Sequence, residues 1–327
     1  MDKIATATKD QRKAIFMDVA NKAGLAPYIV EKDFWVSWAL GKIFANEELK
    51  QILCFKGGTS LSKAYGIIER FSEDIDLILN LSVVLMPDET LNQTSNTKQA
   101  AFNEQIEERA STFITGKLKT MIDAALDNIC KVETNPDDTH VLHIVFPRLF
   151  DYGYIQPNIK LEIGPLALWN PNAEHTITSF VSKMLPELEI QDPVVPTVKA
   201  ERTFWEKTTI LHHEANRPED ATPIQPRYSR HYYDVFKLGH TEIKDLAFAN
   251  LELLKEVVDF KKRFYPRGWA KYDEAKPGTM KLLPPKHSLD ILIADYKNMK
   301  NMIYGDMPSW EEIIAFLTEL ETAINSL

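Results

Sequence analysis

Several features that define common protein classes are missing from this chain of 327 residues. Its two cysteines, Cys54 and Cys130, are too few for a disulfide framework and lack the paired spacing of a zinc site. No apolar run approaches the roughly 20 residues that cross a bilayer, and the N-terminal stretch lacks the apolar core of a signal peptide. We therefore expect a cytoplasmic protein without membrane contact.

The Walker nucleotide-binding pattern is also absent, which excludes a P-loop NTPase. The net charge of −9 argues against a protein that binds nucleic acid over its whole surface. Residues 260–286, here called the basic stretch, reverse this sign: eight basic residues stand against Asp273 and Glu274. Aromatic residues interleave with them at Phe264, Tyr265, Trp269 and Tyr272. Such a mixture suits phosphate contacts and base stacking, and a solvated loop with buried rings is the alternative.

Hydrophobic periodicity predicts an α+β protein. Helices are expected across 8–50, with Asp10 capping the first and Pro27 opening the second, and over 61–68, 104–130 and 179–185. Strands are expected over 52–55, 71–79, 141–147 and 158–164, and a loop over 83–103. After Pro193 and Pro196 the pattern becomes almost wholly helical, so we predict two domains, 1–197 and 198–327.

Two aspartates stand out in the expected strand 71–79, which reads FSEDIDLIL. Strand side chains alternate between faces, so Ser72, Asp74 and Asp76 share one face and the apolar residues take the other. Carboxylates about 7 Å apart repel each other unless a cation lies between them, and magnesium prefers such oxygen ligands. The pattern indicates either a metal site or two aspartates that solvate an exposed sheet face.

A glycine-rich turn precedes this strand. Gly57 and Gly58 permit positive φ, and Thr59 or Ser60 can cap the helix expected from Leu61. Free backbone N–H groups and the helix dipole then favour a phosphate, although a glycine pair alone is more often a structural turn. The strand, turn, helix and DxD strand follow one another within 25 residues, which predicts a triphosphate cradle beside a metal site.

Weaker candidates lie later in the chain. In the strand 158–164, Lys160 and Glu162 share the polar face; Glu162 would complete a two-metal site, or merely pair with a lysine. In the helix 201–215, Lys207 falls on the apolar side, where it either reaches into a cleft or snorkels to the surface. Arg230 and Asp234 lie one helical turn apart and are expected to form a surface ion pair.

Together these segments resemble the AbiEii/AbiGii nucleotidyltransferase toxin family, part of the polymerase-β-like nucleotidyltransferase superfamily. The resemblance rests on FKGGTSLSKAYGIIERFSEDIDLIL at 55–79, with EKD at 31–33, KLEIG at 160–164, ERTFWEKTTILHHEA at 201–215 and RHYYDVFKL at 230–238. It implies an α+β fold of the polymerase-β-like kind, a small mixed sheet with flanking helices, followed by a mainly helical C-terminal domain.

The resemblance also implies roles for individual residues. Asp74, Asp76 and Glu162 would bind the metal, Mg²⁺ or Mn²⁺, and would form the catalytic set together with Lys207 and Asp234. The residues expected to bind the nucleotide are Lys56, Gly57, Gly58, Thr59, Ser60, Lys63, Ser72, Lys207 and Arg230. Two positions differ from the family pattern, because the third metal carboxylate is Glu162 rather than an aspartate and His231 replaces an acidic residue.

The implied activity is transfer of a nucleoside monophosphate from an NTP to an acceptor. In several members the acceptor is the 3′ end of tRNA, and a cognate antitoxin silences the toxin. Three alternatives use the same fold: nucleotidylyl transfer to a protein or small molecule, metal-dependent phosphotransfer, and a non-catalytic module that binds RNA or a protein partner.

Overall fold

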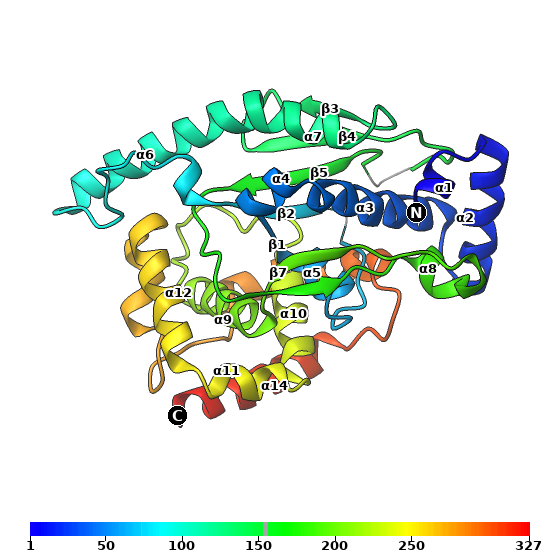
Figure 1. Ribbon diagram of the computed structural model, residues 1–327. Helices are drawn as coiled ribbons and strands as arrows, with labels where there is room; N and C mark the ends of the chain where they lie inside the picture. The colour runs from blue at the N-terminus through cyan, green and yellow to red at the C-terminus, as the bar shows by residue number, and fades with distance from the viewer. Residues whose placement is uncertain (73, 153–155) are drawn as a thin grey trace. The chain divides into compact units, whose positions relative to one another are not determined.

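The computed structural model of the protein describes residues 1–72, 74–152 and 156–327, so Glu73 of the predicted strand 71–79 lies outside the described residues. The chain divides into two compact units. Unit 1 consists of Met1–Tyr65 and Phe71–Val198, and unit 2 of Gly66–Arg70 and Lys199–Leu327. The expected fold class is confirmed, because the chain combines a mixed sheet with many helices and a helical C-terminal region (Figure 1).

Unit 1 is built on a seven-stranded sheet with the order β3-β4-β5-β2-β1-β7-β6. The strands are β1 (Leu53–Lys56), β2 (Asp74–Leu79), β3 (Lys131–Thr134), β4 (Val141–Val145), β5 (Ile159–Gly164), β6 (Asn172–Thr176) and β7 (Val194–Val198). The pairs β2–β5 and β1–β7 are parallel and the others antiparallel. The central strands β1, β2 and β5 are therefore neighbours, and they carry four of the predicted site residues, Lys56, Asp74, Asp76 and Glu162.

The helices of unit 1 differ from the prediction mainly at their ends. They are α1 (Asp2–Ala5), α2 (Lys9–Ala23), α3 (Pro27–Ala45), α4 (Glu47–Ile52), α5 (Gly57–Lys63), α6 (Asn96–Phe113), a π-helical turn (Ile114–Leu118), α7 (Lys119–Ala125) and α8 (Phe180–Met184). The predicted Asp10 cap is wrong: Thr8 caps α2 in a reciprocal box with Gln11. Likewise α6 begins at Asn96 instead of 104, because Ser95 accepts a hydrogen bond from the Lys98 amide.

Helix α3 is the central helix of unit 1. It packs on strands β5 and β7 of the sheet and also contacts α2, α4 and α8. Every residue from Ile29 to Leu40 is buried, because neighbours cover the helix all round. The charged residues of the EKD segment are therefore inside the protein.

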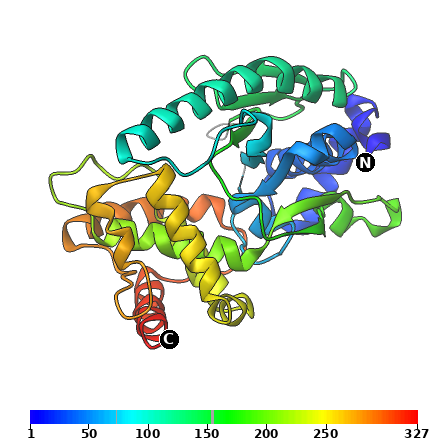
Figure 2. The same ribbon diagram turned by 60° about the vertical axis from the view of Figure 1, so that its left-hand side comes forward.

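Unit 2 is mainly helical, and loops join its helices, as the rotated view also shows (Figure 2). Its helices are α9 (Ala200–Ala215), α10 (Arg230–Gly239), α11 (Ile243–Phe248), α12 (Leu251–Phe264), α13 (Leu289–Asn298) and α14 (Trp310–Asn325). Helix α9 packs against α10, α11 and α12. Short 3₁₀ turns occur in the two units at Leu81–Val83, Pro186–Leu188, Gly268–Ala270, Tyr272–Glu274, Lys286–Ser288 and Met299–Met302. Among the described residues, no helix is both long and apolar enough to span a bilayer.

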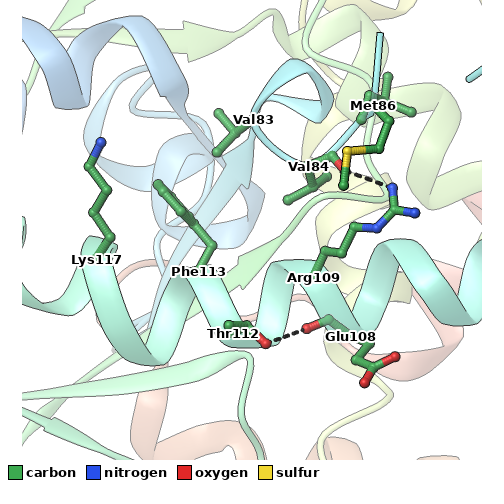
Figure 3. Close-up of a pocket in the computed structure, with 9 residues that line it drawn as sticks. Val83, Val84, Met86, Glu108, Arg109, Thr112, Phe113 and Lys117 are labelled. Carbon is green, nitrogen blue, oxygen red and sulfur yellow. Dashed lines mark hydrogen bonds between the residues drawn. The ribbon is translucent and has the colours of Figure 1, made fainter. Parts of the chain in front are cut away.

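A cavity of about 600 Å³ lies in unit 1 between α6 and the segment that follows β2. Its apolar wall includes Val83, Val84, Met86 and Phe113, and Arg109 donates a 3.1 Å hydrogen bond to the Val84 carbonyl (Figure 3). None of the predicted site residues lines this cavity. The candidate active site is therefore built on the central strands instead.

Candidate active site

The two aspartates of the DxD pattern lie on β2 as the alternation predicts. Asp74 and Asp76 are half-buried, whereas Ile75 and Leu77 are completely buried on the other face of the sheet. Ser72 precedes the strand and is also half-buried. Both carboxylates therefore lie on the polar face of a central strand.

The strand register places Glu162 beside Asp76. Asp76 is the direct partner of Glu162 on β5 and of Lys56 on β1, so these three residues form one row across adjacent strands. Asp74 is the partner of Lys160 in the same way. The Lys160 ammonium forms an ion pair with the Glu162 carboxylate. The third acidic residue thus lies next to the DxD pair, but a lysine engages it.

Gly57 lies directly against Asp76. Its φ of +81° falls in the left-handed region, and a Cβ built there would lie 1.9 Å from Asp76 Oδ2. Helix α5 starts at this glycine, immediately after β1. The first N–H groups of a helix have no intrahelical acceptor, so the start of α5 presents donors close to the Asp76 carboxylate.

The two hydroxyls of the turn do not cap a helix. The prediction that Thr59 or Ser60 caps a helix beginning at Leu61 is wrong, because both residues lie inside α5 and are buried. Thr59 donates its hydroxyl hydrogen to the Asp74 carbonyl, and Ser60 donates to the Gly57 carbonyl at 2.8 Å. The Thr59 hydroxyl therefore ties α5 to β2.

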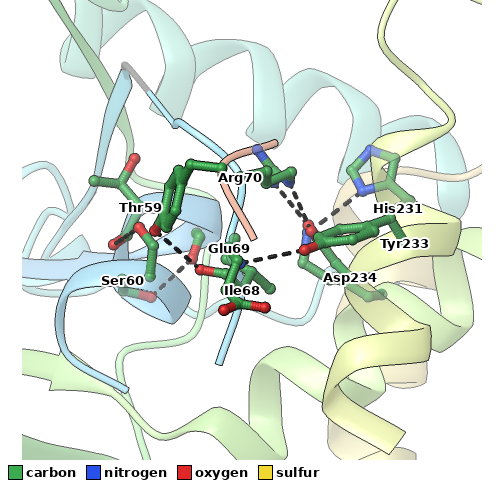
Figure 4. A network of polar contacts seen from close by, with 12 residues as sticks. Thr59, Ser60, Ile68, Glu69, Arg70, His231, Tyr233 and Asp234 are labelled. Atoms are coloured by element: carbon green, nitrogen blue, oxygen red, sulfur yellow. Dashed lines mark hydrogen bonds and ion pairs between the residues drawn. The ribbon is translucent and has the colours of Figure 1, made fainter. Parts of the chain in front are cut away.

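Unit 2 contains a buried cluster of charges around Asp234. The Asp234 carboxylate accepts hydrogen bonds from Arg70 Nε at 2.7 Å and Arg70 Nη2 at 2.8 Å, and it pairs with Lys207 Nζ at 2.7 Å (Figure 4). Asp234 is fully buried, with Arg70 at 3% and Lys207 at 7% exposure. The predicted surface pair of Arg230 and Asp234 is therefore wrong: the aspartate is internal, and its partners are Arg70 and Lys207.

Burial and neighbouring charges shift the pKa values in this cluster. Burial alone would raise the pKa of Asp234, but Arg70 and Lys207 more than offset it and hold that pKa well below its usual value. Burial lowers the pKa of Lys207, and Asp234 opposes that shift. Burial and the nearby cations lower the pKa of His231 strongly, so its neutral ring can accept the contact that Lys207 makes with Nδ1 at 3.4 Å. The buried Asp234 carboxylate is therefore ionised at neutral pH and lies between two basic partners.

Aromatic residues of the basic stretch divide between core and surface. Phe264 and Tyr272 are buried, whereas Tyr265 is 48% exposed. Trp269 is half-buried, and the guanidinium groups of Arg217 and Arg267 lie 5.0 and 6.0 Å from its ring centroid. The stretch therefore provides part of the core of unit 2 as well as exposed basic side chains.

Comparison with known proteins identifies the family. Residues 38–316 match the sequence model described as nucleotidyl transferase AbiEii toxin, type IV toxin–antitoxin system. The chain belongs to the AbiEii family. This AbiEii toxin is similar to a solved structure, MenT4, a nucleotidyltransferase toxin from Mycobacterium tuberculosis H37Rv, at 17% identity and a TM-score of 0.44, covering 95% of this chain and 98% of that one. No curated protein sequence matches it.

Family membership makes this AbiEii chain a nucleotidyltransferase and the toxin of a type IV toxin–antitoxin system. The matched range contains the glycine turn, the DxD strand, Glu162, Lys207 and Asp234. Within the part of the chain that the structure describes, no three histidine, cysteine or acidic side chains are grouped as a ready metal site. The roles predicted for the individual site residues remain predictions.

Sequence reasoning missed two residues of this AbiEii toxin that contact the predicted ones. Arg70 pairs with Asp234, and Asp33 pairs with Lys63 at the end of α5. Each was hard to find because a charged residue far away in the sequence shows no periodicity with its partner. The position of Arg70 four residues before the DxD pair was the one available hint.

Proposed function

We propose that this AbiEii toxin transfers a nucleoside monophosphate from an NTP to the 3′ end of tRNA in a reaction that depends on Mg²⁺, with Mn²⁺ as a substitute. One observation carries the proposal: Lys56, Asp76 and Glu162 form a row on three neighbouring strands beside the first amides of α5. This row combines oxygen ligands for a divalent cation with donors for phosphate.

The carboxylates fit a divalent cation in their chemistry. Asp74, Asp76 and Glu162 offer hard oxygen atoms, and the missing side chain of Gly57 leaves the space that the Asp76 carboxylate occupies. Bound magnesium would neutralise charge on the triphosphate and lower the pKa of the attacking hydroxyl. To serve as third ligand, Glu162 has to exchange its pairing with Lys160 for the cation.

The protein's own groups would then position the reactants. The N–H groups at the start of α5 and the Lys56 ammonium bind the triphosphate, which brings the α-phosphate next to β2. The acceptor hydroxyl would give its proton to the Asp74 or Asp76 carboxylate and attack the α-phosphate, and pyrophosphate would leave on the opposite side with the electrons of the broken P–O bond. Most of the rate acceleration comes from this positioning and from charge neutralisation. We also propose, from family motifs alone, that Lys207, Arg230 and Asp234 take part.

Exposed cations of the basic stretch support an RNA acceptor. Lys262, Arg267, Lys271, Lys276 and Lys281 are all exposed in a protein whose net charge is −9. Such groups contact phosphates without reading sequence, so they suit a long anionic acceptor better than a small molecule. A cognate antitoxin, encoded beside the toxin, would keep the activity silent.

Incubation of the purified protein with total bacterial tRNA, magnesium and each α-³²P-labelled NTP tests this function. A protein with Asp74→Ala and Asp76→Ala runs alongside. We expect label in tRNA with a preferred nucleotide, only with intact aspartates, and loss of label when EDTA removes the metal.

Other outcomes point to the alternatives. Label in protein or a small molecule but not in tRNA contradicts the acceptor and retains the nucleotidyl transfer. Transfer of γ-label instead of α-label indicates phosphotransfer. If the wild type and the double aspartate variant both bind RNA and neither transfers label, the result contradicts a catalytic function and favours a module that only binds RNA.

A further inference from the structure

The EKD segment of α3 places three charged residues in succession inside unit 1. Glu31, Lys32 and Asp33 are 0%, 1% and 4% exposed. A buried charge is costly unless hydrogen bonds and an opposite charge compensate for it. Three such residues in one helical turn therefore need partners, and the partners show what the segment does.

Glu31 and Lys32 bind residues between Leu149 and Gln156, whereas Asp33 binds Lys63 and the start of α8. Glu31 accepts hydrogen bonds from the Leu149 amide at 2.8 Å and the Tyr152 hydroxyl at 3.0 Å, and Lys32 donates to the Gln156 carbonyl at 2.8 Å. Asp33 instead forms an ion pair with Lys63 and accepts a 2.7 Å hydrogen bond from the Phe180 amide. Asp33 therefore connects α3 with the end of α5 and the start of α8.

The Lys63 ammonium is enclosed by these contacts. The side chains of Lys63 and Asp33 are 8% and 5% exposed. Lys63 Nζ also lies 3.5 Å from the Thr178 carbonyl oxygen and 5.6 Å from the centroid of the Phe180 ring. These contacts fix the position of the Lys63 side chain within unit 1.

The position of Lys63 also fixes that of the glycine turn, because one very short helix, α5, joins the two. Lys63 is the last residue of α5 and Gly57 the first, and a helix of seven residues spans only about 10 Å. Such a helix moves as a rigid body, so its two ends cannot be placed independently. At the other end the contact between Gly57 and Asp76 tolerates little displacement, since it has no room even for a Cβ.

We propose that the buried Asp33–Lys63 ion pair positions α5, and through it the nucleotide-binding turn at Gly57, in register with Asp76. Asp33 and Lys63 are positioning residues that do not touch the nucleotide, which gives Lys63 a different role from the phosphate contact that the family motif implied. The proposal rests on the proposed nucleotide site but not on tRNA as acceptor.

The experiment compares NTP affinity with stability in three variants. Lys63→Met keeps the apolar stem beside Phe180 and removes the charge. Asp33→Asn keeps an acceptor for the Phe180 amide. The double variant removes both charges, so no unpaired charge remains buried. Lys42→Met is the control, because Lys42 pairs with Asp2 and Asp127 and lies 5.7 Å from the Trp38 ring, and none of these three residues belongs to α5.

Equilibrium dialysis with magnesium and each of the four NTPs gives the dissociation constants, and thermal melting gives Tm. A displacement of about 1 Å in a binding site can cost on the order of 100-fold in rate, so we expect NTP binding to weaken about tenfold or more in each variant. In the double variant Tm should recover towards wild type, whereas NTP binding should stay weak. Lys42→Met should lower Tm with NTP affinity within about twofold of wild type.

Two results for the variants would contradict the proposal. If the three variants bind NTP with wild-type affinity well below their melting temperatures, the ion pair only stabilises the fold and does not position the turn. If NTP affinity recovers together with Tm in the double variant, the ion pair again only stabilises the fold. Wild-type protein that binds NTP but labels no tRNA defeats only the acceptor, whereas wild-type protein that binds no NTP defeats both proposals.

Discussion

At the scale of single residues, Gly57 carries the strictest requirement in the candidate site. Two independent facts exclude a side chain there: a φ of +81° and the Asp76 carboxylate oxygen 1.9 Å from the position of a Cβ. Backbone strain alone would cost about 1–2 kcal/mol in an L-residue. A side chain at this position would also displace the Asp76 carboxylate, a proposed metal ligand, and backbone strain alone would not do so.

Gly66→Ala separates these two effects. Gly66 has a similar φ of +64°, but no atom lies within 4 Å of its Cβ position. We expect Gly57→Ala to lower nucleotidyl transfer by at least about 100-fold, because the Asp76 carboxylate must move. Gly66→Ala should lose roughly 1 kcal/mol in stability and retain transfer. Transfer assays and urea unfolding on both variants give the answer, and equal activity of the two would refute a role for the Gly57–Asp76 contact.

The residue scale also shows what sequence could and could not predict about the site. Alternation along a strand was enough to place Asp74 and Asp76 on one face and to put Glu162 on the polar face of its own strand. It could not reveal that Arg70 rather than Arg230 holds Asp234. A buried carboxylate takes the cation that tertiary packing brings to it, and helical spacing proposes only the neighbour one turn away.

At the scale of elements, we expect the attachment of α3 to the segment around Leu149 to be sensitive to pH. Burial raises the pKa of Glu31 to about 7, although its bonds to Tyr152 and the Leu149 amide oppose that shift. The folded state therefore holds the Glu31 proton more tightly than the unfolded chain, whose glutamate titrates near 4.5. The stabilisation from this group is full below about pH 4.5 and is lost as the pH rises through about 7.

Replacement of Glu31 by glutamine tests this assignment. A neutral side chain of the same shape cannot titrate, so Glu31→Gln should remove up to one proton from the pH dependence of unfolding between about pH 5 and 8. Urea unfolding of wild type and variant at several pH values measures the free energies. Wild type should lose stability relative to the variant as the pH rises. Parallel curves would show that Glu31 is already ionised at pH 5.

Strands were predictable from the sequence where they carry a short apolar or alternating run, and they were missed elsewhere. Strands β1, β2, β4 and β5 carry short apolar or alternating runs and were all expected. Strands β3 and β6 were missed because their residues, KVET and NAEHT, are mostly polar and lie at the two edges of the sheet, where only Val132 is buried. Strand β7 was missed because Pro196 marked a boundary in the sequence, although the strand continues to Val198.

At the scale of the whole molecule, the division into units does not follow the sequence. Gly66–Arg70 precede the DxD strand by a few residues but belong to unit 2. The Glu69 amide donates to the Tyr233 hydroxyl at 3.2 Å, and the Tyr304 amide donates to the Glu69 carbonyl at 2.9 Å. Arg70 also pairs with Ile303 in a β-bridge. Hydrophobic patterns report local structure, so a five-residue segment contributed to the other unit gives no signal in them.

We propose that Gly66–Arg70 unfolds together with unit 2, and native-state hydrogen exchange can test this in the intact chain. At neutral pH Asp234 is ionised, because Arg70 and Lys207 hold its pKa well below the usual value. Asp234→Asn leaves these two buried cations without their counter-charge, which typically costs about 3–5 kcal/mol. Protection of the Glu69 and Tyr304 amides should fall by the same free energy as that of amides in α9 and α10. Amides in the β1–β2 ladder should keep their protection, since they belong to unit 1. If Glu69 instead keeps its protection with β2, the segment folds with unit 1 and the Arg70–Asp234 pair only joins two separately stable parts.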